Sequence, residues 1–267
     1  MFLIILLILI CVLYILANRC RKGHPGMEDL RGWKYAHRGL HGPGRPENSM
    51  AAFRASLEKG YGIEFDLHLL KDGNLAVIHD STLKRTTGAE GRIEDLTTAE
   101  LKNYRLEGTE EWIPTFRELL DLYAGKAPLI VELKPVDGNH AALCRAACDM
   151  LETYPGAYCV ESFDPRCIRW LKENRPNVIR GQLSENFVKS DPNMPLYLRF
   201  VLTHQLMNFM TLPDFVAYKY ADRISASPCI CRRFWKAQGV SWTLKIQEEF
   251  DTAVKENWLP IFEGFEP

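Results

Sequence analysis

Two histidines, three acidic residues and two basic residues follow strand-like stretches of this chain. They occur in His37-Arg38, Glu64-Phe65-Asp66, His79-Asp80 and Glu132-Leu133-Lys134. Carboxylates at positions i and i+2 of a strand point to the same face of the sheet. Imidazoles, carboxylates and cationic side chains are together sufficient for metal-assisted chemistry on a phosphate ester. The four pieces therefore predict one catalytic site.

Three of these residues, Glu64, Asp66 and Glu132, offer only oxygen ligands, which favours Mg²⁺ or Ca²⁺ over zinc. In the run Ile63-Glu64-Phe65-Asp66-Leu67, bulky apolar residues alternate with the acids. The apolar positions are expected to pack against an outer layer, which turns both acids toward an interior where unpaired carboxylates are costly. The alternative is a solvated strand face. His68 shares the face of the acids and is interpreted as a supporting or structural residue.

The histidines and the basic residues suit two further roles. His37 and His79 can exchange protons near neutral pH, and a departing alkoxide needs an acid while an attacking hydroxyl needs a base. Arg38 and Lys134 can neutralise the charge that grows on phosphoryl oxygens. The competing interpretations are two structural histidines and an internal salt bridge between Lys134 and Glu132.

Strand-like and helix-like stretches alternate through residues 33–267 and give close to eight strands. This pattern favours a TIM (β/α)8 barrel, which collects catalytic groups at the carboxyl ends of its strands. An open doubly wound sheet uses the same alternation but would carry a Gly-rich phosphate-binding turn, which is missing here. Residues 71–74 have the composition of a hairpin turn, and Asn48 or Ser49 can cap a helix that runs to Gly60.

Composition excludes some partners. The 267 residues carry a net charge of -1, so nothing suggests nucleic acid as an electrostatic partner. Eight cysteines are scattered along the chain. Cys229 and Cys231 form a C-x-C pair, but reduced, structural thiols are favoured over a zinc site.

The N-terminus differs from that of a soluble enzyme. Phe2 to Ala17 is an apolar run of 16 residues, about 24 Å long as a helix. Basic residues follow at once: Arg19, Arg21 and Lys22. These features predict an uncleaved transmembrane anchor over residues 1–18, a flexible linker over 19–32, and a single-pass protein of the cell membrane with a cytoplasmic catalytic domain. The alternative is an unusual export signal.

Several short motifs together resemble the glycerophosphodiester phosphodiesterase domain. The resemblance covers about Trp33 to Thr243. Its motifs are His37-Arg38-Gly39, Pro46-Glu47-Asn48-Ser49, Glu64-x-Asp66, Lys71-Asp72-Gly73, His79-Asp80, Arg85-Thr86-Thr87-Gly88, Ile113-Pro114-Thr115, Glu132-Leu133-Lys134, Ser162-Phe163-Asp164-Pro165 and Ser241-Trp242-Thr243.

The resemblance implies a barrel that hydrolyses glycerophosphodiesters to glycerol 3-phosphate and an alcohol with a divalent ion. The predicted anchor would hold the barrel close to lipid, and it extends the expected substrates to lysophospholipids, which would give a lysophosphatidate-type product. It implies an insertion over about residues 80–125 that caps the barrel mouth. The implied roles are an acid–base pair, His37 and His79; metal ligands, Glu64, Asp66 and Glu132; phosphate-binding residues, Arg38 and Lys134; and cleft-lining residues, Phe163 and Trp242.

The chain departs from the family at its end. The family commonly closes with an apolar strand that ends in Thr-Asp near a proline, whereas this chain ends with residues 259–267, Leu-Pro-Ile-Phe-Glu-Gly-Phe-Glu-Pro. Two other functions stay open from the sequence. One is a sphingomyelinase D-like lyase that produces a cyclic phosphate, and the other is a catalytically silent lipid-binding barrel.

Overall fold

Eight parallel strands close into a barrel in the computed structural model, which describes residues 1–267. The hydrogen-bonded order is β1-β9-β8-β7-β6-β5-β4-β2, and β1 pairs with β2 to close the ring. The strands of the ring are β1 (Tyr35–His37), β2 (Gly62–Leu69), β4 (Leu129–Leu133), β5 (Tyr158–Ser162), β6 (Arg180–Ser184), β7 (Phe215–Lys219), β8 (Gln238–Leu244) and β9 (Trp258–Phe262). The predicted TIM barrel is confirmed.

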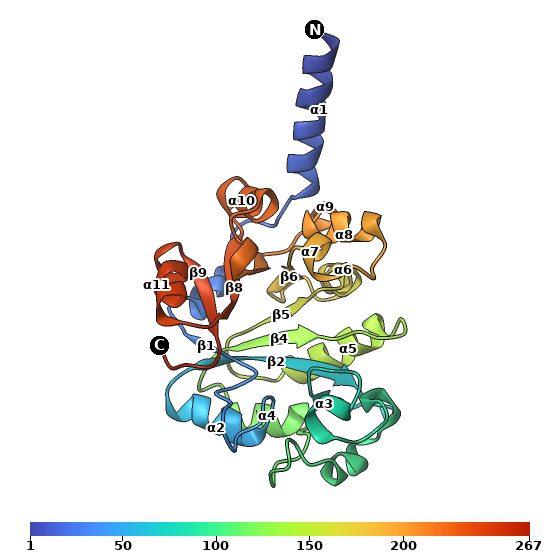
Figure 1. Ribbon diagram of the computed structural model, residues 1–267, viewed down its shortest axis with the longest axis vertical. Helices are drawn as coiled ribbons and strands as arrows, with labels where there is room; N and C mark the ends of the chain where they lie inside the picture. Colours follow the sequence, from blue (N-terminus) through green and yellow to red (C-terminus); the bar gives the residue numbers. More distant parts are fainter.

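Helices alternate with the strands and surround the barrel (Figure 1). The α-helices are α1 (Phe2–Ala17), α2 (Met50–Glu58), α3 (Lys84–Thr87), α4 (Phe116–Tyr123), α5 (His140–Leu151), α6 (Pro165–Asn174), α7 (Phe187–Ser190), α8 (Leu196–Thr203), α9 (Asn208–Thr211), α10 (Ala226–Arg233) and α11 (Gln247–Lys255). Four 3-10 helices complete the elements: η1 (Pro25–Leu30), η2 (Ile93–Asp95), η3 (Thr98–Asn103) and η4 (Tyr220–Asp222).

The side chains of β2 alternate between the two faces of the sheet, as the sequence predicts. Ile63, Phe65 and Leu67 are fully buried in the cluster that joins the strands to the outer helices. The acids between them therefore point to the inside of the barrel. Ser49 caps α2 by accepting from the amide of Ala52, one of the two caps that the sequence allows.

A ninth strand and a small core follow β2. β3 (Leu75–Val77) pairs antiparallel with β2 across the predicted hairpin turn. The chain between β3 and α4 then forms a separate apolar cluster that includes Leu83, Ile93 and Leu101. This cluster is the core of the irregular segment that the sequence assigns to an insertion, whose boundaries remain a prediction.

The close packing around Gly181 inside the barrel leads to a prediction about stability. A Cβ on Gly181 of β6 would lie 2.0 Å from the ring of Phe215 on the neighbouring strand. Because the ring is fully buried, it has little room to move. We expect Gly181→Ala to lower the free energy of unfolding by roughly 1–3 kcal/mol, the usual cost of overpacking a core.

Denaturant unfolding measures this difference, with Gly42→Ala as the matched control. A Cβ on Gly42 would meet no atom closer than 3.9 Å. Equal unfolding midpoints for the two variants would contradict the packing described for Phe215.

The apolar N-terminal helix projects away from the barrel (Figure 1). α1 has 16 residues and none of them is buried. Its length of about 24 Å is shorter than a hydrocarbon core of about 30 Å. None of the helices combines the length and the apolar composition that crossing a bilayer requires. The predicted transmembrane span is therefore not supported.

The segment after α1 is packed against the barrel, so the predicted flexible linker is wrong. Cys20, Met27 and Leu30 are buried. The guanidinium of Arg21 donates to both carboxylate oxygens of Asp214, at 2.5 and 2.6 Å. The base of α1 is consequently held to the barrel by specific contacts.

Candidate active site

One cavity brings together nearly all of the predicted site residues. It has a volume of about 170 Å³ and lies at the carboxyl ends of the barrel strands. Among the predicted residues, all but Asp66 line it, and Asp66 is buried beside it. The predicted residues in its lining are His37, Arg38, Glu64, His79, Glu132, Lys134, Phe163 and Trp242.

Three carboxylates converge at the floor of this cavity. Glu64 and Asp66 come from β2 and Glu132 from β4, where Asp66 and Glu132 are register partners. Each has an exposed fraction of 6% or less. Each offers a carboxylate oxygen, and the three oxygens lie within 4.8 Å of one another. No hydrogen bond of good geometry reaches Asp66 Oδ1 or Glu132 Oε1.

The pKa values of these three carboxylates are shifted in different directions. Burial and the neighbouring carboxylates raise the pKa of Glu64 well above its usual value. Burial raises the pKa of Glu132 to about 7, although Lys134 opposes the shift. Burial also acts to raise the pKa of Asp66, but Lys134, His79 and other partners outweigh it and hold that pKa low. A buried site with this much negative charge fits a divalent cation held by oxygen ligands.

Two cationic side chains border the carboxylates. Lys134 Nζ lies 2.6 Å from Glu132 Oε1 and 3.1 Å from Asp66 Oδ1. Arg38 Nη1 donates to Glu47 Oε1 at 2.9 Å, and Arg38 Nε lies 3.4 Å from Asp66 Oδ2. Burial alone would lower the pKa of Lys134, but Glu132 and Asp66 raise it above its usual value. Both side chains are thus charged. The salt bridge between Lys134 and Glu132 is present, and Lys134 lines the cavity as well.

His79 is held by a chain of charged groups. Its Nδ1 lies 2.6 Å from Asp80 Oδ1. Arg85 donates to Asp80 and to Glu47, and Glu47 accepts from Arg38 in turn. Because a carboxylate accepts the Nδ1 proton, Nε2 of the neutral ring is left to accept a proton, which the charged ring can then donate. Burial lowers the pKa of His79.

His37 also has a carboxylate on its Nδ1 side. Glu263 Oε1, just after β9, lies 3.4 Å from His37 Nδ1, while Glu64 Oε2 lies 3.8 Å from His37 Nε2. Burial lowers the pKa of His37, and Glu263 opposes this shift. Glu263 is not among the site residues predicted from the sequence, because this residue belongs to the C-terminal segment that departs from the family pattern.

A fourth acid, Glu161, is also part of the site. It lies on β5 as the register partner of Glu132. It lines the cavity with an exposed fraction of 1%, and burial raises its pKa well above the usual value. Its alternation with Val160, an apolar residue that packs in the same cluster as the apolar residues of β2, is the sequence signal that would have identified it.

Aromatic residues form one wall of the cavity. The rings of Phe163 and Trp242 pack edge to face with centroids 5.7 Å apart. Lys134 Nζ lies 5.8 Å from the centre of the Phe163 ring. His68 lies outside the cavity: its Nδ1 contacts Glu94 and its Nε2 contacts the backbone carbonyl of His79. The supporting role predicted for His68 agrees with these contacts.

Metal binding is expected to affect stability in a pH-dependent way. Glu64 and Glu132 have raised folded-state pKa values, so their contribution to stability is present below about pH 4.5 and is lost as the pH rises through the folded values. A bound divalent ion reverses that loss. We therefore expect Mg²⁺ or Ca²⁺ to raise the melting temperature more at pH 8 than at pH 5.

Scanning calorimetry with and without the ion measures this difference at each pH. The lowered pKa values of His37 and His79 act in the opposite direction on absolute stability, so the ion-induced shift is the informative quantity. An ion-induced shift that is equal at both pH values would contradict the prediction.

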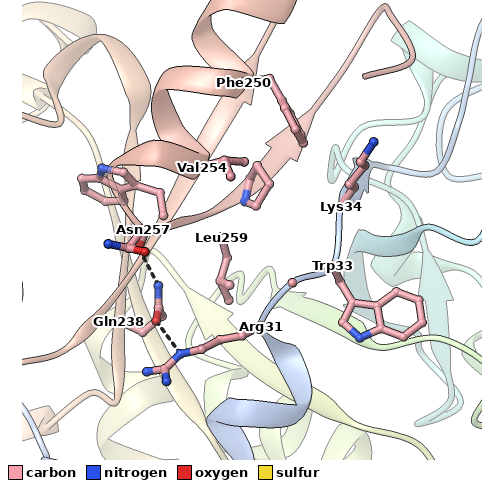
Figure 2. A pocket seen from close by; sticks show the side chains of 11 residues that line it. Arg31, Trp33, Lys34, Gln238, Phe250, Val254, Asn257 and Leu259 are labelled. Carbon is pink, nitrogen blue, oxygen red and sulfur yellow. Dashed lines mark hydrogen bonds between the residues drawn. The ribbon is translucent and has the colours of Figure 1, made fainter.

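A larger cavity lies at the other end of the barrel. Its volume is about 570 Å³, and it is formed near the amino ends of β1, β8 and β9 (Figure 2). There Arg31 Nε donates to Gln238 Oε1 at 3.0 Å, and Gln238 Nε2 donates to the backbone carbonyl of Asn257 at 2.9 Å. This cavity contains none of the predicted site residues.

Known proteins with similar sequences include a glycerophosphodiester phosphodiesterase and a lysophospholipase D. A glycerophosphodiester phosphodiesterase of Caldanaerobacter subterraneus subsp. tengcongensis is 28% identical over 232 residues, which covers 82% of this chain and 88% of that protein. A lysophospholipase D of Rattus norvegicus is 30% identical over 132 residues, 45% of this chain and 40% of that protein.

A solved structure shows the same fold. A phosphodiesterase of Oleispira antarctica, in complex with the product sn-glycerol-3-phosphate, matches with a TM-score of 0.69 and 21% identity over 86% of this chain and 92% of that one. The model of the glycerophosphoryl diester phosphodiesterase family matches residues 37–224, which include every residue of the cavity described above except Trp242, Thr243 and Ile261. The chain therefore belongs to this family and is a phosphoric diester hydrolase.

Proposed function

We propose that this barrel hydrolyses glycerophosphodiesters to glycerol 3-phosphate and an alcohol, with a divalent cation and with His37 and His79 as the acid–base pair. The observation that carries the proposal is the matched setting of the two imidazoles. Each has a carboxylate on its Nδ1 side, Glu263 for one and Asp80 for the other, and both line one cavity beside three convergent carboxylates.

The imidazoles divide the proton transfers between them. One accepts the proton of the attacking hydroxyl, which is that of water in the step that yields glycerol 3-phosphate, and the other donates a proton to the departing alkoxide, whose pKa is far above 7. Asp80 bonds with Nδ1 of His79, and Glu263 lies on the Nδ1 side of His37, which leaves Nε2 of each ring for proton transfer. The lowered pKa values of both histidines place their proton exchange on the acidic side of neutrality.

The charged residues bind the phosphate. Glu64, Asp66 and Glu132 would hold the ion, Mg²⁺ or Ca²⁺, which supplies positive charge against the phosphate oxygens when it is bound. Arg38 and Lys134 add two further positive charges at the cavity wall. A phosphate that entered the cavity would replace part of their present contacts with carboxylates.

The volume of the cavity limits how much of the substrate it can enclose. A volume of about 170 Å³ is below the range of about 300–1,000 Å³ that encloses a drug-sized ligand. The phosphate and glycerol part therefore fills the cavity, and the alcohol part extends past the aromatic wall of Phe163 and Trp242. This arrangement favours tolerance toward different alcohol groups.

A substrate panel tests the proposed function. Release of glycerol 3-phosphate is measured from glycerophosphocholine, glycerophosphoethanolamine and glycerophosphoglycerol, and release of a lysophosphatidate from a lysophospholipid, each with Mg²⁺ and with Ca²⁺. We expect turnover of several head groups with one or both ions. Binding of these compounds without turnover would instead support a silent lipid-binding barrel.

We further propose that α1 brings the barrel to a membrane surface on the cytoplasmic side. Its apolar residues cover the whole circumference of the helix, and a helix of this kind is normally surrounded by apolar material. Aromatic residues bracket its last turn: Tyr14 bonds with His204, and Trp235 Nε1 donates to the carbonyl of Ile15 at 2.8 Å. Such residues favour the membrane–water interface.

This placement predicts a preference among substrates. A barrel held close to lipid should act on a lysophospholipid in vesicles with a lower KM than a chain without α1, while kcat stays unchanged because the phosphate chemistry is the same. The comparison uses the full chain and a chain that lacks residues 2–12. That deletion keeps Tyr14 and the buried segment after it.

Glycerophosphocholine is the control substrate, because it is soluble in water. We expect equal KM values for it with both chains. If both chains also have equal KM values for the lysophospholipid, α1 has no part in substrate capture.

A further inference from the structure

A second cluster of potential metal ligands lies on the other side of His37. His37, His41 and Glu263 each offer a ligand atom, and these atoms lie within 4.8 Å of one another. The cluster joins three segments that are distant in sequence or separated by a turn: the end of β1, the loop after it and the residue that follows β9. None of the proposed steps of catalysis uses His41.

We infer that His37, His41 and Glu263 form an inhibitory site for zinc, distinct from the three-carboxylate site for Mg²⁺ or Ca²⁺. Two imidazole nitrogens and one carboxylate oxygen are the ligand set of many zinc sites, with open positions for water. The three-carboxylate site offers oxygen alone, so the two sites differ in the ions that they prefer.

The distances from Glu263 to the two imidazoles suit a zinc ion. Zinc ligands lie about 2.0–2.2 Å from the metal, so two ligands at a tetrahedral angle are about 3.4 Å apart. His37 Nδ1 lies 3.4 Å and His41 Nε2 lies 3.1 Å from the same oxygen, Glu263 Oε1. Lys245 holds the other oxygen of Glu263, which leaves Oε1 toward the two imidazoles. Only small side-chain shifts would be needed to bind an ion.

Zinc bound by His37, His41 and Glu263 would stop turnover. This consequence rests on the proposed acid–base role of His37. A neutral imidazole that binds zinc through Nδ1 carries its one proton on Nε2, the nitrogen that lies 3.8 Å from Glu64. It has no lone pair left to accept another proton, so His37 can no longer pass between its neutral and charged forms.

The test uses the full chain saturated with Mg²⁺. Equilibrium dialysis measures zinc binding, and glycerol 3-phosphate release from glycerophosphocholine measures inhibition. His41→Gln is the central variant, because the Gln amide can still donate to Glu263 but is a poor zinc ligand. We expect unchanged turnover without zinc, loss of one bound zinc, and a zinc concentration for half-inhibition raised at least about tenfold.

Two further variants sharpen the result. His140→Gln, at an exposed position whose ring contacts the carbonyl of Gly138, should leave zinc binding and inhibition unchanged. Lys245→Met removes a positive charge beside Glu263 that would repel the ion, so zinc should bind more tightly. The exposed thiol of Cys11 is present in every variant, so zinc bound there cancels in the comparison.

Two outcomes would overturn the inference. Zinc binding that His41→Gln leaves intact and Glu132→Gln removes would place zinc in the three-carboxylate site instead. Absence of bound zinc on the wild-type chain would also overturn it. If the barrel hydrolyses none of the substrates, the dialysis result still decides whether the zinc site exists, which separates this inference from the proposed function.

Discussion

Replacing Glu132 with glutamine is expected to abolish turnover and to weaken binding of Mg²⁺ and Ca²⁺. Glu132 is one of three buried carboxylates whose oxygens lie within 4.8 Å of one another, and Gln keeps the shape while removing the charge. The loss should reach at least roughly 10³-fold in kcat, because the ion and its charge are lost together. Glu64→Gln and Asp66→Asn should have the same effect.

Steady-state kinetics and isothermal titration calorimetry with each ion measure the two effects. Glu173→Gln is the control, because Glu173 is exposed on α6 and pairs only with Arg169. We expect Glu132→Gln to stay folded, since the raised pKa of Glu132 shows that its environment accepts a neutral side chain. Normal turnover in the presence of EDTA by all three carboxylate variants would refute metal dependence.

The second large effect is expected at the histidines. His37→Ala and His79→Ala should each lower kcat by roughly 10²–10⁴-fold, the usual contribution of a positioned general acid or base. Both variants should keep the barrel folded, because both rings lie partly open at the cavity and outside the apolar clusters.

Kinetics on glycerophosphocholine, together with melting temperatures, separate a chemical loss from an unfolding effect. His140→Ala is the matched control, since His140 begins α5 away from the cavity. Asp80→Asn should give a smaller loss than His79→Ala, because it removes only the group that orients the ring. A His79→Ala variant with near-normal kcat would show that His79 is not part of the acid–base pair.

Much of the barrel and of the site could be predicted from local patterns. The alternation along β2 determines which residues face the helices and which face inward, and this periodicity is visible in one short run of sequence. His37 and the cationic residues lie at the ends of barrel strands, so the closure of the barrel brings them together, and His79 follows β3, which pairs back along β2.

Features that depend on distant contacts were not predictable in this way. Glu263 reaches His37 only because β9 pairs with β1, and no short motif marks that pairing. The polar segment after α1 has the glycines and proline of a linker, but a long-range ion pair between Arg21 and Asp214 fixes it to the barrel. Composition alone also suggested a membrane span that the 16-residue length of α1 does not support.

The most direct test of the account is ³¹P NMR of glycerophosphocholine mixed with the full chain after removal of bound metal. We expect no change until Mg²⁺ or Ca²⁺ is added, followed by conversion to glycerol 3-phosphate, and no conversion with either ion when the His79→Ala variant replaces the wild-type chain. Accumulation of a cyclic phosphate as the final product would instead identify a lyase. Full conversion in the presence of EDTA, or by the His79→Ala variant, would contradict the metal-dependent acid–base hydrolysis proposed for this site.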